Sequence, residues 1–194
     1  ATYFFNGGVE QPHPGEDFFN IPSPKVFDYS NTPQMSAEII KDEVIYRLDN
    51  REQKKYGFIF INFANPDMMG HTGNLQAAIA ANEVTDRCVR DISAKALEIG
   101  GAVMITSDHG NCETMIDRVT KKVDTAHTNN HVHFIVLSDQ SQISTQQKGR
   151  IEKIGTGKRA QPTGILADVA PTVLSVLGVH QPTSMTGVNL LSVL

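Results

Sequence analysis

Residues 56–74 read YGFIFINFANPDMMGHTGN, and this stretch decides the fold. The first six residues form a near-continuous apolar run, typical of a strand that is buried on both faces. A turn rich in Gly, Asn and Pro follows, and apolar residues at steps of three and four predict a long helix after Asn74. Strand, turn and helix in this order are the repeating unit of a parallel α/β sheet.

The same pattern recurs along the chain. Further strands are predicted at residues 2–6, 102–106 and 133–137. Helices are predicted over residues 36–48, with Ser36 as N-cap, over 75–99, ended by Gly100-Gly101, and over 167–177, ended by Gly178. Residues 7–24 carry many Gly and Pro and predict a long loop, and residues 138–162 a surface excursion. We therefore expect an α/β fold, with a mainly parallel sheet flanked by helices, over residues 1–194.

Composition narrows the classes of function. The chain has 194 residues, of which 40% are hydrophobic and 20% charged, and a net charge of −4. Scattered basic residues and this net charge argue against nucleic acid binding, and no apolar run reaches the ~20 residues of a membrane span. Cys88 falls on an apolar helical stripe and is predicted in the core. Together with Cys112 it predicts no disulfide framework, which favours a reducing cytoplasm.

Asp67 and His71 are the first candidate ligands. They lie four residues apart where a turn curls into a helix, so both side chains can face one point, and a carboxylate with a neutral imidazole suits Mn²⁺ or Zn²⁺. The alternative is structural: Asp67 as a turn former after Pro66 and His71 as a helix cap.

Asp108 and His109 form a second candidate pair, again after an apolar strand. Gly110 follows and permits a turn that lets the two side chains diverge toward two metals. A strand-terminating turn is the structural alternative. Because ligands bind at the carboxyl ends of the strands in open α/β sheets, we expect both pairs to lie at one sheet edge, all on loops.

His127 stands between the small residues Ala126 and Thr128, which leaves room for a metal or a phosphate oxygen. Taken alone it would be a surface or capping histidine. His131 and His133 are predicted to be structural. Ser107 is predicted to pack inward at the strand end, and we do not assign it as a nucleophile. The set of two Asp and three His predicts a divalent-metal site, with two metals, of the kind that handles phosphate.

Three motifs, NFANPDMMGHTGN, SDHGN and TAHT, resemble the signatures of the cofactor-independent (2,3-bisphosphoglycerate-independent) phosphoglycerate mutases, which are alkaline phosphatase-like metalloenzymes. FFNGG at residues 4–8, SPKV at 23–26 and LADVAPT at 166–172 agree, so the resemblance runs along essentially the whole chain. The departures are small: His13 stands where the family usually has an aromatic residue, and Ser107 where Ala is common.

The resemblance implies a ligand set. Asp67, His71 and His127 match the ligands of one Mn²⁺, and Asp108 and His109 match ligands of a second, with Zn²⁺, Mg²⁺ or Co²⁺ as alternatives. It also implies interconversion of 3-phosphoglycerate and 2-phosphoglycerate through a phosphoserine, in glycolysis and gluconeogenesis.

Parts of the family's chain have no match here: the first strand with a metal-binding Asp, the helix with the nucleophilic Ser, and the domain that grips the glycerate. We therefore expect residues 1–194 to be the C-terminal part of the phosphatase-like domain, without catalytic nucleophile and inactive alone, and the missing N-terminal half to be its partner. Two alternatives stay open: another two-metal phosphatase or phosphopentomutase-like enzyme, and a non-catalytic metal-binding remnant.

Overall fold

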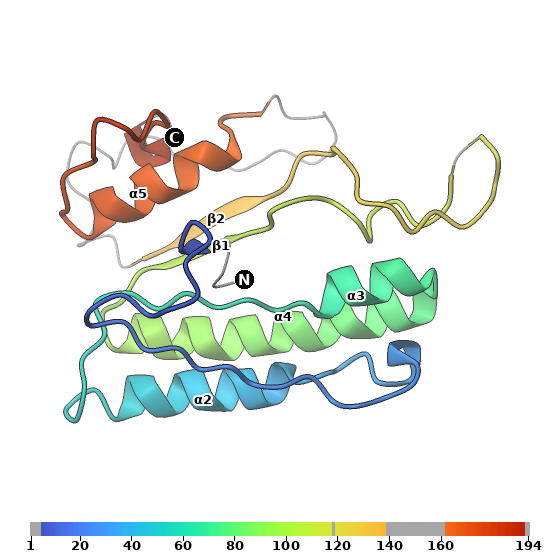
Figure 1. Ribbon diagram of the computed structural model, residues 1–194, viewed down its shortest axis with the longest axis horizontal. Helices are drawn as coiled ribbons and strands as arrows, with labels where there is room; N and C mark the ends of the chain where they lie inside the picture. The colour runs from blue at the N-terminus through green and yellow to red at the C-terminus, as the bar shows by residue number, and fades with distance from the viewer. Residues whose placement is uncertain (1–4, 118, 139–161, 193–194) are drawn as a thin grey trace. The chain divides into compact units, whose positions relative to one another are not determined.

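The computed structural model describes residues 5–117, 119–138 and 162–192 (Figure 1). The chain forms two compact units. Unit 1 contains Ala1–Asp91 and Asn111–Ala126, and unit 2 contains Ile92–Gly110 and His127–Leu194. The long helix α4 (Leu75–Glu98) begins in unit 1 and ends in unit 2.

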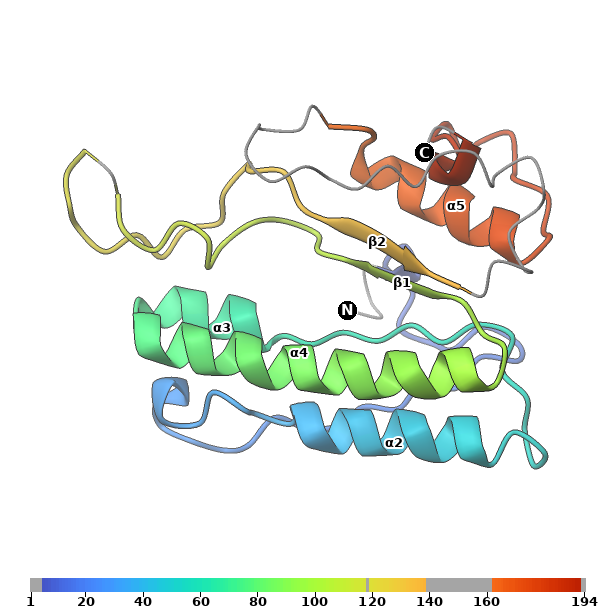
Figure 2. The ribbon, with the colours of Figure 1, turned by 180° about the vertical axis from the view of Figure 1, so that it is seen from behind.

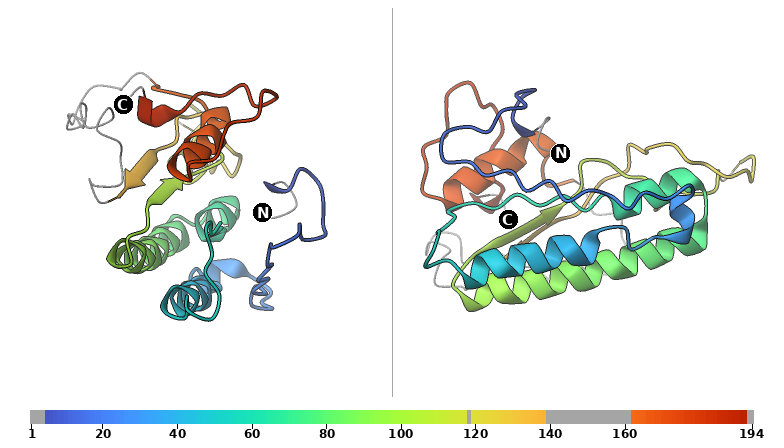
Figure 3. Two further views of the ribbon diagram at one scale, coloured as in Figure 1. Left: turned by 90° about the vertical axis from the view of Figure 1, so that its left-hand side faces the viewer. Right: turned by 60° about the horizontal axis from the view of Figure 1, so that its bottom comes forward.

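Unit 1 is built from helices and ordered loops. A 3-10 turn, η1 (Tyr29–Asn31), precedes α2 (Ala37–Asp49), and the short helix α3 (Asn65–Thr72) precedes α4. Figure 3 shows α2 and α4 running side by side. The core lies where α3, α4 and the segment after Asn111 meet, and its buried members are Met69, Ala77, Ala78, Ala81 and Met115.

The predicted helices are confirmed with small changes at their ends. Ser36 occupies the N-cap position of α2, but its hydroxyl donates to the carbonyl oxygen of Pro22 at 2.8 Å instead of capping the helix. Cys88 is fully buried in α4, as predicted. The helix ends at Glu98, two residues before Gly100, which has a φ of 79°. The N–H of Gly101 donates to the carbonyl of Ala96 at 2.7 Å.

Unit 2 contains the sheet (Figure 2). Strands β1 (Val103–Thr106) and β2 (Phe134–Leu137) lie where strands are predicted, and α5 (Val169–Val176) lies beside them, preceded by η2 (Leu166–Asp168) and followed by η3 (Leu190–Ser192). The strands pair antiparallel, with Val103 opposite Leu137, so the expectation of parallel pairing is wrong for them. A parallel pair needs a crossover, usually helical, and the residues described between β1 and β2 contain no helix.

The apolar run at residues 56–61 is not a buried strand. Phe58 and Phe60 are 44% and 45% exposed, and within the described ranges this run belongs to no ladder. The ring of Phe5 stacks on both side chains instead, with centroid distances of 5.8 Å to Phe58 and 4.4 Å to Phe60. Burial on two faces needs packed layers on both faces of the strand. In the described part of the chain Phe58 and Phe60 stack with Phe5 and stay partly exposed, and the hydroxyl of Tyr56 donates to the carboxylate of Asp17.

Two expectations fall largely outside the described residues: the strand at 2–6, apart from Phe5 and Asn6, and nearly all of the excursion at 138–162. None of the helices in the described part of the chain combines the length and the apolarity that crossing a membrane requires.

Candidate metal centre

Helix α3 brings Asp67 and His71 together. Pro66 lies in its first turn, where the missing N–H costs nothing, and Gly73 ends it with a φ of 69°. Residues four apart lie on the same face of a helix, and the Nε2 atom of His71 lies 3.3 Å from Oδ1 of Asp67. The prediction that the two side chains face one point is confirmed, but they lie on a helix, not on a loop.

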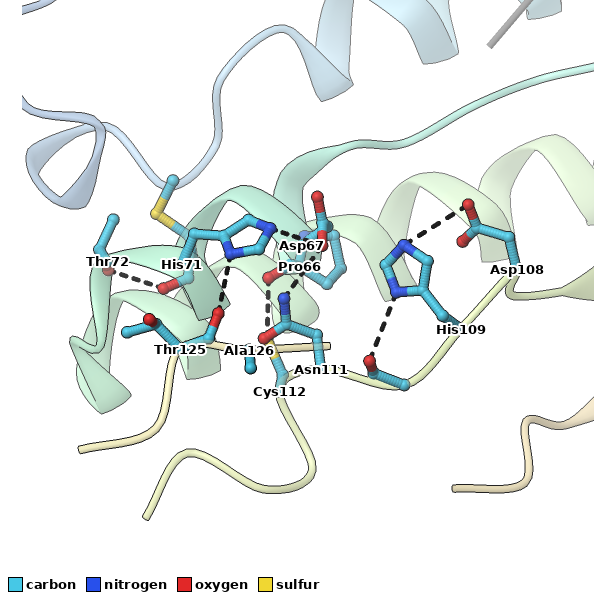
Figure 4. Close-up of polar contacts among 12 residues, drawn as sticks. Pro66, Asp67, His71, Thr72, Asp108, His109, Asn111, Cys112, Thr125 and Ala126 are labelled. Carbon is cyan, nitrogen blue, oxygen red and sulfur yellow. Dashed lines mark hydrogen bonds and ion pairs between the residues drawn. The ribbon is translucent and has the colours of Figure 1, made fainter. Parts of the chain in front are cut away.

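A backbone carbonyl orients the imidazole of His71 (Figure 4). Its Nδ1 lies 2.8 Å from the carbonyl oxygen of Thr125. Because a carbonyl only accepts hydrogen bonds, Nδ1 carries the proton in this contact, and in the neutral ring the lone pair is on Nε2. That lone pair faces a carboxylate oxygen, and an imidazole nitrogen beside a carboxylate is a donor set that fits a divalent cation.

Asp67 is in turn held by Asn111, whose Nδ2 donates to Oδ1 of Asp67 at 3.0 Å. The neighbouring thiol of Cys112 donates to the carbonyl of Pro66 at 2.8 Å, and burial raises the pKa of this thiol. The segment after Gly110 is therefore attached to α3 at two points. Sequence analysis missed the roles of Asn111 and Thr125, because both act across more than forty residues of chain.

Unit 2 holds the second predicted pair, Asp108 and His109, directly after β1. Nε2 of His109 lies 3.6 Å from Oδ2 of Asp108, and Nδ1 lies 3.3 Å from the carbonyl of Gly110. The carboxylate of Asp108 is 85% exposed, while the His109 side chain is 28% exposed. This pair lies on a loop, as predicted, and its carboxylate is open to solvent.

His127 also belongs to unit 2, where it stacks on His109. The ring centroids are 3.7 Å apart and the ring planes differ by 20°. The contact follows from a backbone bridge, in which the N–H of Thr128 donates to the carbonyl of Gly110 at 2.8 Å. The assignment of His127 to the same metal as Asp67 and His71 stays a prediction.

The remaining candidates lie at the surface. Ser107 is exposed, and its hydroxyl donates to the carbonyl of His109 at 2.7 Å, so the expected inward packing is wrong. Strand β1 ends at Thr106, and side-chain alternation therefore does not extend to Ser107. His131 and His133 are exposed and precede β2.

A protein-family model of the Metalloenzyme superfamily matches residues 1–181. Among curated proteins, the 2,3-bisphosphoglycerate-independent phosphoglycerate mutase of Clostridium tetani is 52% identical over 191 residues, and that of Clostridium beijerinckii is 48% identical over 191 residues. Each alignment covers 98% of this chain but 34% of the relative, so the chain spans about a third of the length of these relatives.

A solved structure of phosphoglycerate mutase from Leishmania mexicana, determined at low cobalt concentration, is similar with a TM-score of 0.78 and 26% identity. The similarity covers 97% of this chain and 34% of that chain. The α/β, alkaline phosphatase-like class expected from the sequence is thereby confirmed.

Proposed function

This chain belongs to the metalloenzyme superfamily, and on that premise we propose that it is the C-terminal, metal-binding part of a 2,3-bisphosphoglycerate-independent phosphoglycerate mutase. The complete enzyme interconverts 3-phosphoglycerate and 2-phosphoglycerate. The names of the relatives at 52% and 48% identity support this proposal. The observation that carries it is the facing pair in α3, in which the imidazole nitrogen of His71 and a carboxylate oxygen of Asp67 lie 3.3 Å apart.

The proposed metal set has two divalent ions, Mn²⁺ in each position. Asp67, His71 and His127 would hold one ion, and Asp108 and His109 the other. When bound, such ions lower the pKa of a nucleophilic hydroxyl and neutralise charge on the phosphoryl oxygens. The chain's own contribution is to orient the ligands: the Thr125 carbonyl fixes the tautomer of His71 by accepting from Nδ1 at 2.8 Å.

The same proposal places the reaction in glycolysis and gluconeogenesis, in the cytoplasm. Both cysteines are free, which fits a reducing compartment. The nucleophilic serine of the family matches none of these residues, and the glycerate-gripping domain and the first metal-binding strand would come from an N-terminal half. That half is the proposed partner of residues 1–194.

Two measurements test the proposal. The full natural protein is stripped of metal and assayed with 3-phosphoglycerate, a phosphopentose and a model phosphoester, before and after addition of Mn²⁺. We expect 2-phosphoglycerate to form only with Mn²⁺ and without 2,3-bisphosphoglycerate. Turnover of the other substrates in place of 3-phosphoglycerate would instead identify another two-metal phosphotransferase or phosphatase.

Calorimetric titration with Mn²⁺ then locates the ions. His71→Ala should remove one binding event and Asp108→Ala the other, whereas His180→Ala, an exposed histidine outside the site, should remove neither. The metal assignment is wrong if the wild-type protein binds no Mn²⁺, or if both ligand variants bind as it does.

A further inference from the structure

We propose that Asn111 is a positioning residue for Asp67, and that Gly70 is glycine because it must admit the Asn111 amide. The proposal rests on the proposed function, since it gives Asp67 the role of a metal ligand. It concerns residues of unit 1 alone, and Figure 4 shows the contact between the two side chains.

The chemistry of the pair fixes the orientation of the amide. A carboxylate can only accept hydrogen bonds, so the Nδ2 atom of Asn111 faces Oδ1 of Asp67, at 3.0 Å. Asn111 is 6% exposed, so water does not compete freely for this bond. A buried donor aimed at a carboxylate limits the rotation of the carboxylate before any ion arrives.

The other end of the amide has no such bond. Oδ1 of Asn111 is buried and has no hydrogen-bond partner within the described part of the chain. It lies over Gly70, where an added Cβ would be 2.0 Å from Oδ1 and 2.6 Å from Cγ. An unsatisfied buried acceptor is unfavourable for folding, so stability alone does not account for the asparagine.

Asn65, the first residue of α3, is a buried asparagine with a purely structural role and serves as a comparison for Asn111. It is 2% exposed, and its Nδ2 donates to the carbonyl oxygens of Pro33 at 2.9 Å and Gln34 at 2.7 Å. Both contacts tie a loop to α3 and neither reaches a candidate ligand. Asn111 instead donates its hydrogen bond to the carboxylate of a candidate ligand, Asp67.

The backbone holds Asn111 in place independently of Asp67. Its N–H donates to Oε2 of Glu113 at 2.7 Å, and its carbonyl accepts from the N–H of Thr114 at 3.1 Å. The thiol of Cys112 is bonded to the Pro66 carbonyl on α3. The side-chain amide is thus presented by a turn that is closed by its own hydrogen bonds and attached to α3 through Cys112, which favours a fixed orientation of the ligand.

Mn²⁺ titration of the full chain tests the proposal. Loss of an outer partner of a metal ligand typically lowers metal affinity about 10–100-fold, and we expect this loss for Asn111→Ala and for Asn111→Leu, which keeps the branched shape and removes both polar atoms. Asn65→Ala is the matched control: it should lower the melting temperature of the metal-free protein and leave the Mn²⁺ affinity within about twofold of wild type.

Gly70→Ala tests the second half of the proposal. The new methyl group displaces the amide, so the affinity should fall to about that of Asn111→Ala. In the double variant Gly70→Ala/Asn111→Ala the new methyl group meets no amide. Its Mn²⁺ affinity should therefore equal that of Asn111→Ala alone, because the two changes act through one contact. Independent, additive losses would contradict a shared mechanism.

Co²⁺ gives a readout that a general loss of stability does not move. At saturating Co²⁺ the visible absorption spectrum should change in Asn111→Ala and stay as in wild type in Asn65→Ala. If wild type binds Mn²⁺ and Asn111→Ala and Asn111→Leu bind equally well with an unchanged spectrum, Asn111 has no positioning role. If wild type itself binds no metal, it is the proposed function that fails.

Discussion

Helices α3 and α5 are each eight residues long and each is followed within two residues by a glycine with positive φ, Gly73 at 69° and Gly178 at 67°. Both begin near an aspartate, yet the two carboxylates are satisfied in different ways. Asp168 is buried, and its two oxygens accept from the backbone N–H groups of Ile165 and Val188, each at 2.8 Å. Asp67 is half-buried, bonded by a side-chain amide and faced by an imidazole.

The difference separates a structural carboxylate from a candidate ligand. Backbone amides saturate Asp168 and hold the pKa of its carboxyl below the ordinary value, so the group serves the fold. Asp67 is instead contacted by the imidazole of His71, which can bind a metal, and by the amide of Asn111, which can orient the carboxylate. The kind of group that satisfies an aspartate is therefore more informative here than its position at the start of a helix.

The largest effect on stability is expected from the core under α3. Met69 is fully buried, and Met69→Ala should lower the free energy of unfolding by about 2–5 kcal/mol, the usual cost of such a cavity. Val176→Ala in α5, where the side chain is 41% exposed, is the control and should cost clearly less. Urea denaturation measures the free energy of unfolding of both variants. If Met69→Ala lowers it no more than Val176→Ala does, the buried Met69 side chain does not contribute to stability as expected.

Exchanging each carboxylate for an amide tests the comparison directly. Asp67→Asn removes a charged ligand and should weaken Mn²⁺ binding more than the ~100-fold upper range for an outer partner. Asp168→Asn places an NH₂ group against a backbone N–H donor, so it should lower the melting temperature and leave Mn²⁺ affinity unchanged. The reverse pattern, with weaker binding in Asp168→Asn only, would invert the two roles.

A smaller difference in the free energy of unfolding is expected when the glycine after each helix is replaced by alanine. An alanine in the left-handed conformation costs about 1–2 kcal/mol, which applies to Gly73→Ala and to Gly178→Ala. A Cβ at Gly73 would lie 2.5 Å from Cγ1 of Val123, whereas nothing lies within 4 Å at Gly178. Gly73→Ala should therefore be the more destabilising in urea, and an equal cost would mean that Val123 moves freely.

The smallest effect is expected in the pH dependence of folding stability, through the carboxyl group of Asp168. Hydrogen bonds from the N–H groups of Ile165 and Val188 lower the folded-state pKa of the Asp168 carboxyl below its ordinary value. Its contribution is therefore fully present above the unfolded-state pKa of about 3.9 and is lost as pH falls through the lower folded-state pKa. Thermal melting from pH 7 to pH 2 should show a shallower acid-side decline in Asp168→Asn, and an unchanged decline would contradict this assignment.

Local sequence signals predicted the long elements well. The period of α4 and its Gly100-Gly101 stop, the strands predicted at 102–106 and 133–137 and the closing helix are features of neighbouring residues, and these are present. The strand predicted at 56–61 does not form within the described residues. The ligand pairs Asp67/His71 and Asp108/His109 are also close in sequence, so their proximity could be predicted from spacing alone.

Non-local features could not be predicted in this way. The antiparallel direction of β1 and β2 depends on the path of the chain between them. The sequence predicts a turn where α3 forms, because Pro and Gly are typical turn residues, although proline in a first turn is also a helix-start signal. The amide of Asn111 and the carbonyl of Thr125 reach α3 from residues 44 and 54 positions away from their partners.

That separation has a consequence for synthesis on the ribosome. The contact between His71 and Thr125 joins residues 54 positions apart, so at about 5–20 residues per second translation needs roughly 3–11 s to supply the second partner. During this interval the nascent chain already contains the Asp67–His71 motif, but without the carbonyl that fixes the tautomer of the imidazole. The oriented pair can therefore exist only after residue 125 has been added.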